Sequence, residues 1–372
     1  MEFTIHKETF LKALQKVQGI VEKRNTMPIL SNVLLEATAG VLQVTATDLE
    51  VGMKSSYEAS IVKDGKITVS AKKVYEIIRE LPDAEIHFAT RANDWVEIRC
   101  GKAFFSIVGL SSDEFPYFQK VNEEAFISLD AAQISGMIEK TAYAICHDET
   151  KYNLNGIFIR ASEKEGRNVL TMVATDGHRL SLVEQGYAGA VGKEMGKGFI
   201  LPKKGVFELK KIADEGDGQI LFGIQDSSAV VRRENTTVIM RLVDGEFPDY
   251  TKVIPVANDR VVLVRREEFL HSLKRMAILS SEKFKGIKFE VNPGTMTISS
   301  SNPEFGEANE EMEITYDGAP LVARFNARYL IDVASVLQGD EVRLLFRDEL
   351  SPALVKPAGE EGFLAVVMPM RI

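Results

Sequence analysis

The string Asp176-Gly177-His178-Arg179 holds the residues best suited to catalysis in this sequence. An aspartate that orients a histidine makes the imidazole a candidate general base, as in a hydrolase. No serine or cysteine nucleophile is paired with Asp176 and His178 in any recognisable motif. A hydrolase that uses Asp176 and His178 therefore stays an alternative, and we predict that the chain has no catalytic residue.

Two other strings contain groups that bind ions or phosphates. His147-Asp148-Glu149 offers metal-ligand types, but three adjacent residues do not easily converge on one ion, so we interpret them as an exposed loop. Gly192-Lys193 and Gly196-Lys197 lack the serine or threonine and the upstream glycine of a phosphate loop. Cys100 and Cys146 are too few for a cysteine zinc site or a disulfide framework. We predict neither metal nor cofactor, and a reducing, cytoplasmic setting.

Length and composition limit the classes of protein. A chain of 372 residues is too long for one ordinary core, so we expect two or three domains. No apolar run approaches the roughly 18 residues of a membrane span. The N-terminal string Met1-Glu2-Phe3-Thr4-Ile5 has neither the basic start nor the apolar core of a signal peptide. The net charge of -9 argues against nucleic-acid binding unless lysine and arginine are concentrated on one surface.

One pattern of elements occurs three times along the chain, in units of roughly 120 to 130 residues, far longer than solenoid repeats. Each unit begins with a short alternating segment and an amphipathic helix, whose apolar residues follow a helical spacing. Two strands come next, and then a third strand that leads into a second helix with a basic residue at its start. Three short strands close the unit, and in the first copy they are expected over 85–88, 95–100 and 103–108. The first helices are expected over 8–21, 131–144 and 266–280, the paired strands over 32–37 and 42–47, 155–161 and 170–175, and 286–291 and 295–300, and the strand with the second helix over 67–78, 199–209 and 321–331.

The strongest sign of repetition is a turn after the second paired strand of each unit. Asp48 and Asp176 lie 128 residues apart, and Asp176 and Asn302 lie 126 apart. Aspartate and asparagine at a strand end predict hydrogen bonds from the backbone to the side chain. We place domain boundaries near residues 122 and 253, which gives domains 1–122, 123–252 and 253–372. Each is expected to be an α+β domain with two helices packed on antiparallel sheet. Domains joined head to tail can close into a ring.

Lysine and arginine recur on the predicted helices, while acidic clusters such as 304–313 fall elsewhere. If these helices line one surface, the resulting basic stripe binds the phosphate backbone independently of base sequence. The alternative is a set of solvated helix faces. No base-reading motif is present. The basic residues are Lys7, Lys12, Lys16, Lys23, Arg24, Lys72, Lys73, Arg79, Lys140, Lys203, Lys204, Lys210, Lys211, Arg265, Arg266, Lys274, Arg275 and Arg328.

Six strings spread over the whole chain resemble the β sliding clamp family of bacterial DNA polymerase III. The resemblance implies three tandem clamp-type domains and a head-to-tail homodimer that closes a six-domain ring around duplex DNA. It further implies a non-catalytic processivity factor whose groove docks short linear motifs of the polymerase III α subunit, the clamp loader, other DNA polymerases and repair proteins, with no membrane partner. The strings are 26–30, 47–50, 152–156, 173–180, 243–250 and 367–372.

The resemblance also implies site residues, which we carry over string by string. The peptide-binding groove would comprise Leu154, Thr175, Gly177, His178, Arg179, Leu180, Pro248, Val253, Asn326, Tyr329, Val366, Val367, Met368, Pro369, Met370 and Arg371. DNA would contact Arg24, Lys73, His147, Lys151, Tyr152, Lys203 and Lys204. The dimer interface would include Phe105, Ile278 and Leu279.

The C-terminal tail and three departures from the family pattern bear on the groove. Met368, Pro369 and Met370 form an apolar tail that suits a groove for varied apolar peptides, although such a tail could simply complete the last strand. Lys252 stands where arginine is common, Asn153 where a second aromatic residue is common, and Ile372 where leucine is usual. Lysine keeps the charge but loses the planar fork, so these changes concern the fine specificity of the groove. An open DNA-binding scaffold that never closes remains a further alternative.

Overall fold

The computed structural model describes residues 1–21, 27–122, 126–189, 193–280 and 286–370. The chain forms two compact units. The first comprises Met1–Ala131 with Phe207–Leu242, and the second comprises Ala132–Val206 with Val243–Ile372. The second of the three repeats expected from the sequence therefore contributes to both units.

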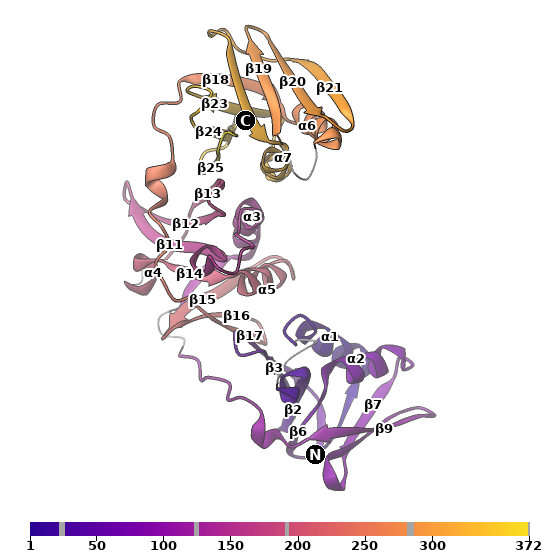
Figure 1. Ribbon diagram of the computed structural model, residues 1–372. Coiled ribbons are helices and arrows are strands. Elements are labelled where there is room, and N and C mark those ends of the chain that lie inside the picture. The colour runs from indigo at the N-terminus through magenta and orange to yellow at the C-terminus, as the bar shows by residue number, and fades with distance from the viewer. Residues whose placement is uncertain (22–26, 123–125, 190–192, 281–285, 371–372) are drawn as a thin grey trace. The chain divides into compact units, whose positions relative to one another are not determined.

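The first unit is built on a large antiparallel sheet, in which strands from the start of the chain are indigo to magenta and β15, β16 and β17 are pink to salmon in Figure 1. Among the described residues the strand order is β10-β15-β16-β17-β4-β3-β2-β6-β9-β8-β7-β1-β5. The elements are β1 (Glu2–His6), α1 (Lys7–Val17), β2 (Asn32–Thr38), β3 (Val41–Thr47), β4 (Val51–Glu58), β5 (Ser60–Lys63), β6 (Gly65–Ser70), α2 (Ala71–Glu80), β7 (Glu85–Thr90), β8 (Trp95–Cys100), β9 (Ala103–Leu110), β10 (Ile127–Asp130), β15 (Gln219–Gln225), β16 (Ser228–Arg233) and β17 (Thr236–Arg241).

Helices α1 and α2 lie side by side over this sheet (Figure 1). The Phe10 ring on α1 packs edge-on against Phe3 and Phe88, whose rings stack 4.8 Å apart. All three side chains are fully buried, so α1 is held by the apolar face that its helical spacing predicted. The Ser70 side chain accepts a hydrogen bond from the backbone N–H of Lys73 and caps α2.

The second unit contains two antiparallel sheets, with strand orders β14-β11-β12-β13-β25-β24-β23-β18 and β21-β20-β19-β22 in the described part of the chain. Helices α6 and α7 lie beside each other against the second of these sheets (Figure 1). The elements are α3 (Ala131–Ala142), β11 (Gly156–Lys164), β12 (Arg167–Thr175), β13 (Arg179–Gly186), α4 (Lys193–Lys197), β14 (Phe199–Pro202), α5 (Lys203–Ala213), β18 (Arg260–Arg265), α6 (Arg266–Leu279), β19 (Gly286–Asn292), β20 (Thr295–Asn302), β21 (Gly306–Glu313), β22 (Leu321–Asn326), α7 (Ala327–Val336), β23 (Glu341–Phe346), β24 (Ala353–Pro357) and β25 (Phe363–Val367). Of these, α3 and α5 cross the boundary between the two units.

Strand pairing joins each repeat to the next. Strand β4 of the first repeat pairs with β17 of the second, with Val51 opposite Met240. Strand β13 of the second repeat pairs in the same way with β25 of the third, with Arg179 opposite Val367. Because backbone hydrogen bonds cross both junctions, the compact units do not follow the sequence repeats.

The expected helices and strands are confirmed, with differences in the helix ends and in the number of strands. Helices α1 and α3 end at Val17 and Ala142, although the sequence predicted helices to residues 21 and 144. Strands β4, β5, β13 and β21 were not predicted. Strand β21 lies where the sequence showed only an acidic cluster, because it is the last strand of its sheet and its side chains are mostly exposed.

Candidate functional site

The three related turns share one hydrogen bond. The side-chain Oδ1 of Asp48, Asp176 and Asn302 accepts a hydrogen bond from the backbone N–H two residues later, at 2.9 Å in all three turns. This bond confirms the turn chemistry predicted from the sequence. The three turns therefore share one local backbone structure, and they differ in the contacts that their other side chains make.

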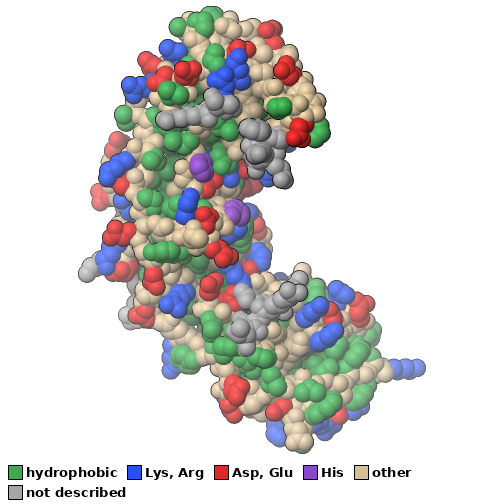
Figure 2. Space-filling model, in the orientation of Figure 1, with side chains coloured by type: hydrophobic (Ala, Val, Ile, Leu, Met, Phe, Trp, Pro, Cys, Tyr) green, Lys and Arg blue, Asp and Glu red, His purple; other side chains and the backbone are tan. Residues whose placement is uncertain are grey.

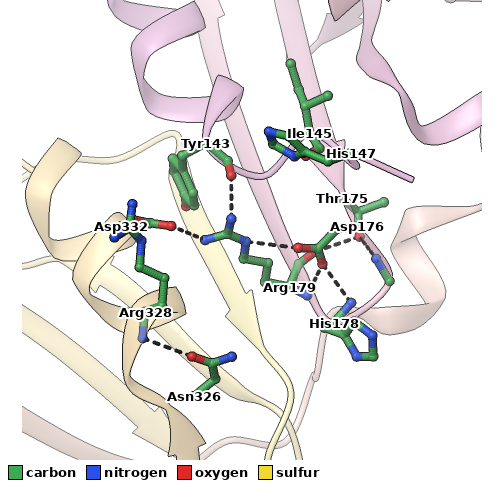
Figure 3. A network of polar contacts seen from close by, with 11 residues as sticks. Tyr143, Ile145, His147, Thr175, Asp176, His178, Arg179, Asn326, Arg328 and Asp332 are labelled. Atoms are coloured by element: carbon green, nitrogen blue, oxygen red, sulfur yellow. Dashed lines mark hydrogen bonds and ion pairs between the residues drawn. The ribbon is translucent and has the colours of Figure 1, made fainter. Parts of the chain in front are cut away.

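Arg179 makes the second turn different from the other two. Its buried guanidinium pairs with Asp176 Oδ2 at 3.1 Å and with Asp332 Oδ2 on α7 at 2.7 Å, and donates a hydrogen bond to the Tyr143 carbonyl at 2.6 Å (Figure 3). The guanidinium also lies over the Tyr329 ring, 4.6 Å from its centroid. Arg179 thus ties together the turn, the end of α3 and helix α7. Burial raises the pKa of the Tyr143 and Tyr329 hydroxyls, so both rings stay neutral.

These contacts argue against a catalytic pair at Asp176 and His178. Asp176 accepts hydrogen bonds from two backbone N–H groups and pairs with Arg179 through its second oxygen. Its oxygens are therefore engaged in holding the turn and Arg179. The exposed His178 ring instead stacks beside Tyr329, with an interplanar angle of 18° and a centroid distance of 6.5 Å. Residues 176–179 therefore have a structural role, because they fix the turn that borders the neighbouring surface.

A groove with a cavity of about 170 Å³ lies beside this turn. Hydrophobic side chains gather over β13 and β25 in Figure 2. The buried residues Leu180, Tyr250 and Val366 belong to one hydrophobic cluster, and Met368 is 42% exposed. A surface of this kind buries apolar side chains of a ligand. The cavity is lined by Leu154, Thr175, Gly177, His178, Arg179, Leu180, Pro248, Asp249, Tyr250, Val253, Val366 and Met368.

Two of these lining residues, Asp249 and Tyr250, were not among the groove residues predicted from the sequence. Both belong to the string 243–250, which is one of the six that resemble the family. The other ten were implied by the resemblance. Among the implied residues that do not line the cavity, Val367 is fully buried, Asn326 caps α7 by accepting from the Arg328 N–H, and Tyr329 lies against Arg179.

The tail after β25 continues to form backbone hydrogen bonds. The Met368 N–H donates to the His178 carbonyl at 2.9 Å, and the Met370 N–H donates to the Arg324 carbonyl at 2.8 Å. Pro369 and Met370 are half-buried beside these bonds. The tail therefore continues past β25 as hydrogen-bonded backbone, and its apolar side chains add to the surface beside the groove. Arg371 and Ile372 lie outside the described residues.

Two departures from the family pattern lie at the rim of the groove. Lys252 forms an ion pair with Asp249 at 3.2 Å, and the Asn153 side chain donates to the Glu246 carbonyl at 3.1 Å. Hydrogen bonds from Thr251, followed by one from Lys252, lower the pKa of the Asp249 carboxyl. The groove therefore has an ionised carboxylate in its lining, which is paired with the Lys252 ammonium.

The residues expected to contact DNA that the structure describes are exposed or half-buried. Lys151 and Tyr152 are exposed next to each other, and the His147 ring contacts the Ile145 carbonyl at 3.0 Å. Lys203 and Lys204 begin α5 and are half-buried, whereas Lys73 is exposed on α2 and pairs with Glu76. Arg24 lies outside the described residues, so the structure says nothing of it.

Many of the basic helix residues are neutralised by nearby carboxylates, which the sequence did not indicate. Lys140 is buried against Glu360, Arg275 pairs with Glu310, and Lys16 pairs with Glu215 at 2.8 Å. Two of these partners, Glu215 and Glu360, lie outside the acidic clusters noted in the sequence, whereas Glu310 belongs to the cluster 304–313. Fewer positive charges are available for phosphates than the sequence count suggested.

Strand β9 and helix α6 present apolar side chains to solvent. Among the described strands, β9 pairs fully with β8, but it pairs with β6 only at Gly109 and Leu110. Phe105 on β9 is 37% exposed, and Ile278 near the end of α6 is 79% exposed, with Leu279 half-buried beside it. An exposed strand edge with aromatic side chains is suited to pairing with another chain.

The described residues lack three other kinds of site. They contain no cluster of three His, Cys, Asp or Glu side chains that could hold a metal ion. The helices within this part of the chain are too short or too polar to cross a membrane. Cys100 and Cys146 are both free and buried.

Comparison with known proteins identifies the family. Models of the DNA polymerase III beta subunit match residues 1–119 (N-terminal domain), 128–249 (central domain) and 251–371 (C-terminal domain). The beta sliding clamp of Caulobacter vibrioides is 37% identical and that of Escherichia coli K12 is 34% identical, each over the full length of both chains. The crystal structure of the Bartonella birtlesii DnaN sliding clamp has a TM-score of 0.95 at 35% identity, again with full coverage of both chains. The chain therefore belongs to the β sliding clamp family, the non-catalytic DNA polymerase III subunits that keep the polymerase on DNA, and it consists of three tandem clamp domains.

Proposed function

We propose that the groove beside the Asp176 turn is the docking site through which this clamp holds its partners. The observation that carries the proposal is the apolar cavity formed where the second and third clamp domains share a sheet. Leu180, Tyr250 and Val366 would form its floor, while Val253 and Met368 would cover apolar side chains of a bound peptide. Methionine suits this role because its flexible side chain adapts to different ligands.

The partners that fit this groove are extended segments of other proteins. We infer that short linear motifs of the polymerase III α subunit, the clamp loader, other DNA polymerases and repair proteins compete for it. The structure of the Bartonella birtlesii clamp is bound to griselimycin, as is that of a Pseudomonas aeruginosa clamp. We propose that griselimycin also binds the groove of this chain.

A competition experiment tests the groove. Surface plasmon resonance would measure binding of the purified polymerase III α subunit to immobilised clamp, with increasing griselimycin in solution. We expect griselimycin to abolish binding of the α subunit. Simultaneous binding of both ligands would show that the α subunit docks elsewhere.

We further propose a head-to-tail homodimer that closes around duplex DNA. Strand β9 with Phe105 and helix α6 with Ile278 and Leu279 would form the two seams, since both present apolar surface to solvent. The phosphate backbone would contact Arg24, Lys73, His147, Lys151, Tyr152, Lys203 and Lys204, independently of base sequence.

Two measurements test the ring. The dimer should have about twice the 41.3 kDa mass of the chain, and clamp loaded on a nicked DNA circle should leave once the circle is cut. Equal retention on circular and cut DNA would contradict topological binding. The alternative, an open DNA-binding scaffold, predicts that Phe105→Asp or Ile278→Asp leaves DNA association intact, whereas the ring predicts its loss.

We infer domain boundaries near residues 122 and 253, supported by the matching turns on either side of each. We also propose a cytoplasmic location, where the two free thiols would stay reduced and the replication partners are found.

A further inference from the structure

A second cavity, of about 500 Å³, lies in the first unit, whereas the groove belongs to the second. Its walls come from α1 and the turn after it, from β4, from α5 and the turn that follows, and from the turn between β16 and β17. They include Lys16, Gly19, Met53, Glu208, Lys211 and Glu215. The cavity is about three times the volume of the groove.

The cavity lies where the first and second clamp domains meet, at the position that corresponds to the Arg179 cluster. Val51 begins β4 as Arg179 begins β13, and each pairs with a strand of the following domain. Glu208 is the sixth residue of α5, as Asp332 is the sixth residue of α7. Gly19 and Tyr143 are each the thirteenth residue counted from the start of α1 and α3.

The first of these junctions keeps the acid but lacks the arginine and the aromatic ring. Valine replaces Arg179 and glycine replaces Tyr143, which removes the groups that fill the second junction. Glu208 is only 3% exposed, and its Oε1 accepts from Lys211 at 2.5 Å. Its Oε2 is buried and has no hydrogen-bond partner among the described residues. A buried carboxylate oxygen without a donor is costly, so a donor is expected to occupy this place.

We propose that this cavity binds a guanidinium group, which donates to Glu208 Oε2 where the Arg179 guanidinium would be at the other junction. A planar guanidinium fits because it supplies several donors in one plane and carries the opposite charge. Two of the three lysines of the wall are neutralised, since Lys16 is paired with Glu215 and Lys211 with Glu208, and the wall holds as many glutamates as lysines once Glu234 is included. The guanidinium comes either from an arginine side chain of a partner protein or from a small free molecule.

Isothermal titration calorimetry with the full-length clamp tests the site, with agmatine as the free guanidinium and Gly-Arg-Gly as the side chain in a peptide. We expect saturable binding of one probe per chain. Tighter binding of the peptide would assign the site to a partner's arginine, and tighter binding of agmatine to a small molecule. Glu208→Gln should weaken binding at least tenfold, while the control Glu58→Gln, at an exposed carboxylate at the end of β4, should leave it unchanged.

A second variant supplies the guanidinium from within the chain. Met53→Arg, at the residue of β4 that lines the cavity, should fill the cavity and abolish agmatine binding. Absence of saturable binding by both probes, or equal binding by Glu208→Gln, would overturn the proposal. Displacement of agmatine by inorganic phosphate would also overturn it, because the lysines would then form an anion site. Griselimycin binding, measured on the same variants, reports separately on the groove and should not change.

Discussion

The turns at Asp48 and Asp176 share their side-chain-to-backbone bonds but support different surroundings. Each is followed by a strand that pairs with the next clamp domain, starting at Val51 in one case and at Arg179 in the other. Valine adds only apolar contact at its junction, whereas arginine draws Asp332 and Tyr143 to the turn. The residues at two matching positions, Val51 against Arg179 and Gly19 against Tyr143, therefore distinguish the junction that has a cavity from the one that is closed by the arginine cluster.

The surfaces beside the two turns differ in the same way. The cavity beside Asp48 has a volume of about 360 Å³ and is lined in part by Glu50, Asp226 and Arg241. Strand register places Arg241 of β17 where Met368 follows β25, and Ile239 where Val366 lies. The first site is thus charged where the second is apolar. This difference indicates that only the second copy is suited to apolar peptide side chains.

The largest effect is expected from Arg179→Ala. It leaves two partly buried carboxylates without their shared partner, which costs about 3 kcal/mol of the free energy of unfolding. Because β13 and α7 lose their common anchor, binding of the α subunit should weaken more than tenfold. Urea unfolding and surface plasmon resonance would measure the two effects.

Two variants calibrate this result. Arg179→Lys keeps the charge without the planar fork and should give an intermediate loss. Val51→Ala, at the matching position, should cost about 2 kcal/mol through lost burial and leave α-subunit binding unchanged. Equal loss of binding in Val51→Ala and Arg179→Ala would show that the cluster has no special role at the groove.

A smaller effect is expected from Met368→Ala. Removing an apolar side chain at the rim should weaken α-subunit binding about tenfold, or about 1.4 kcal/mol, with little change in stability. Arg241→Ala at the corresponding position beside Asp48 is the matched control and should change binding by less than about twofold. A comparable loss in both variants would contradict the assignment of docking to the second copy.

Gly177 and Leu49 both have positive φ, and substituting each one tests how much backbone strain contributes to stability at its turn. Gly177 has φ +90°, and a Cβ there would meet no atom closer than Lys151 Nζ at 3.9 Å. Gly177→Ala should therefore cost only the left-handed penalty, about 1 kcal/mol. Leu49 adopts φ +79° in the first turn, and Leu49→Gly relieves its strain but makes the unfolded chain more flexible. We expect its unfolding free energy to stay within about 0.5 kcal/mol of the original, as urea unfolding would show.

The smallest expected effect is on the pKa of the Asp249 carboxyl. At the first turn the matching residue is Tyr117, since it follows Pro116 as Asp249 follows Pro248. Because hydrogen bonds from Thr251 lower the pKa of Asp249 below 3.8, its contribution to stability is present above that value and lost as pH falls through the lower, folded pKa. Thr251→Val removes the side-chain donor and should move the pKa back toward 3.8, as an NMR titration would show. An unchanged pKa would mean that Lys252 alone keeps the carboxyl ionised.

Local structure was largely predictable from the residues themselves. The spacing of Phe10 and Leu14 predicted the buried face of α1, and the aspartate at 176 predicted its turn, because both depend on interactions within a few residues. Strand β13 was not predicted, although it forms part of the groove. Its first five residues are all buried, and such a run lacks the alternation that marks a half-buried strand.

The sequence by itself determined the triplication, the element types and the family, since these follow from local periodicity and from strings that repeat or match. Tertiary structure alone decided which side chains meet. Arg179 reaches Asp332, 153 residues away, and Glu208 lies beside Gly19, because strands pair across successive domains. In the folded chain, Asp176 of the Asp-Gly-His-Arg string holds the turn and Arg179, and the other three residues line the groove. A one-dimensional pattern does not encode such long-range contacts, because their energy depends on burial and geometry that exist only after folding.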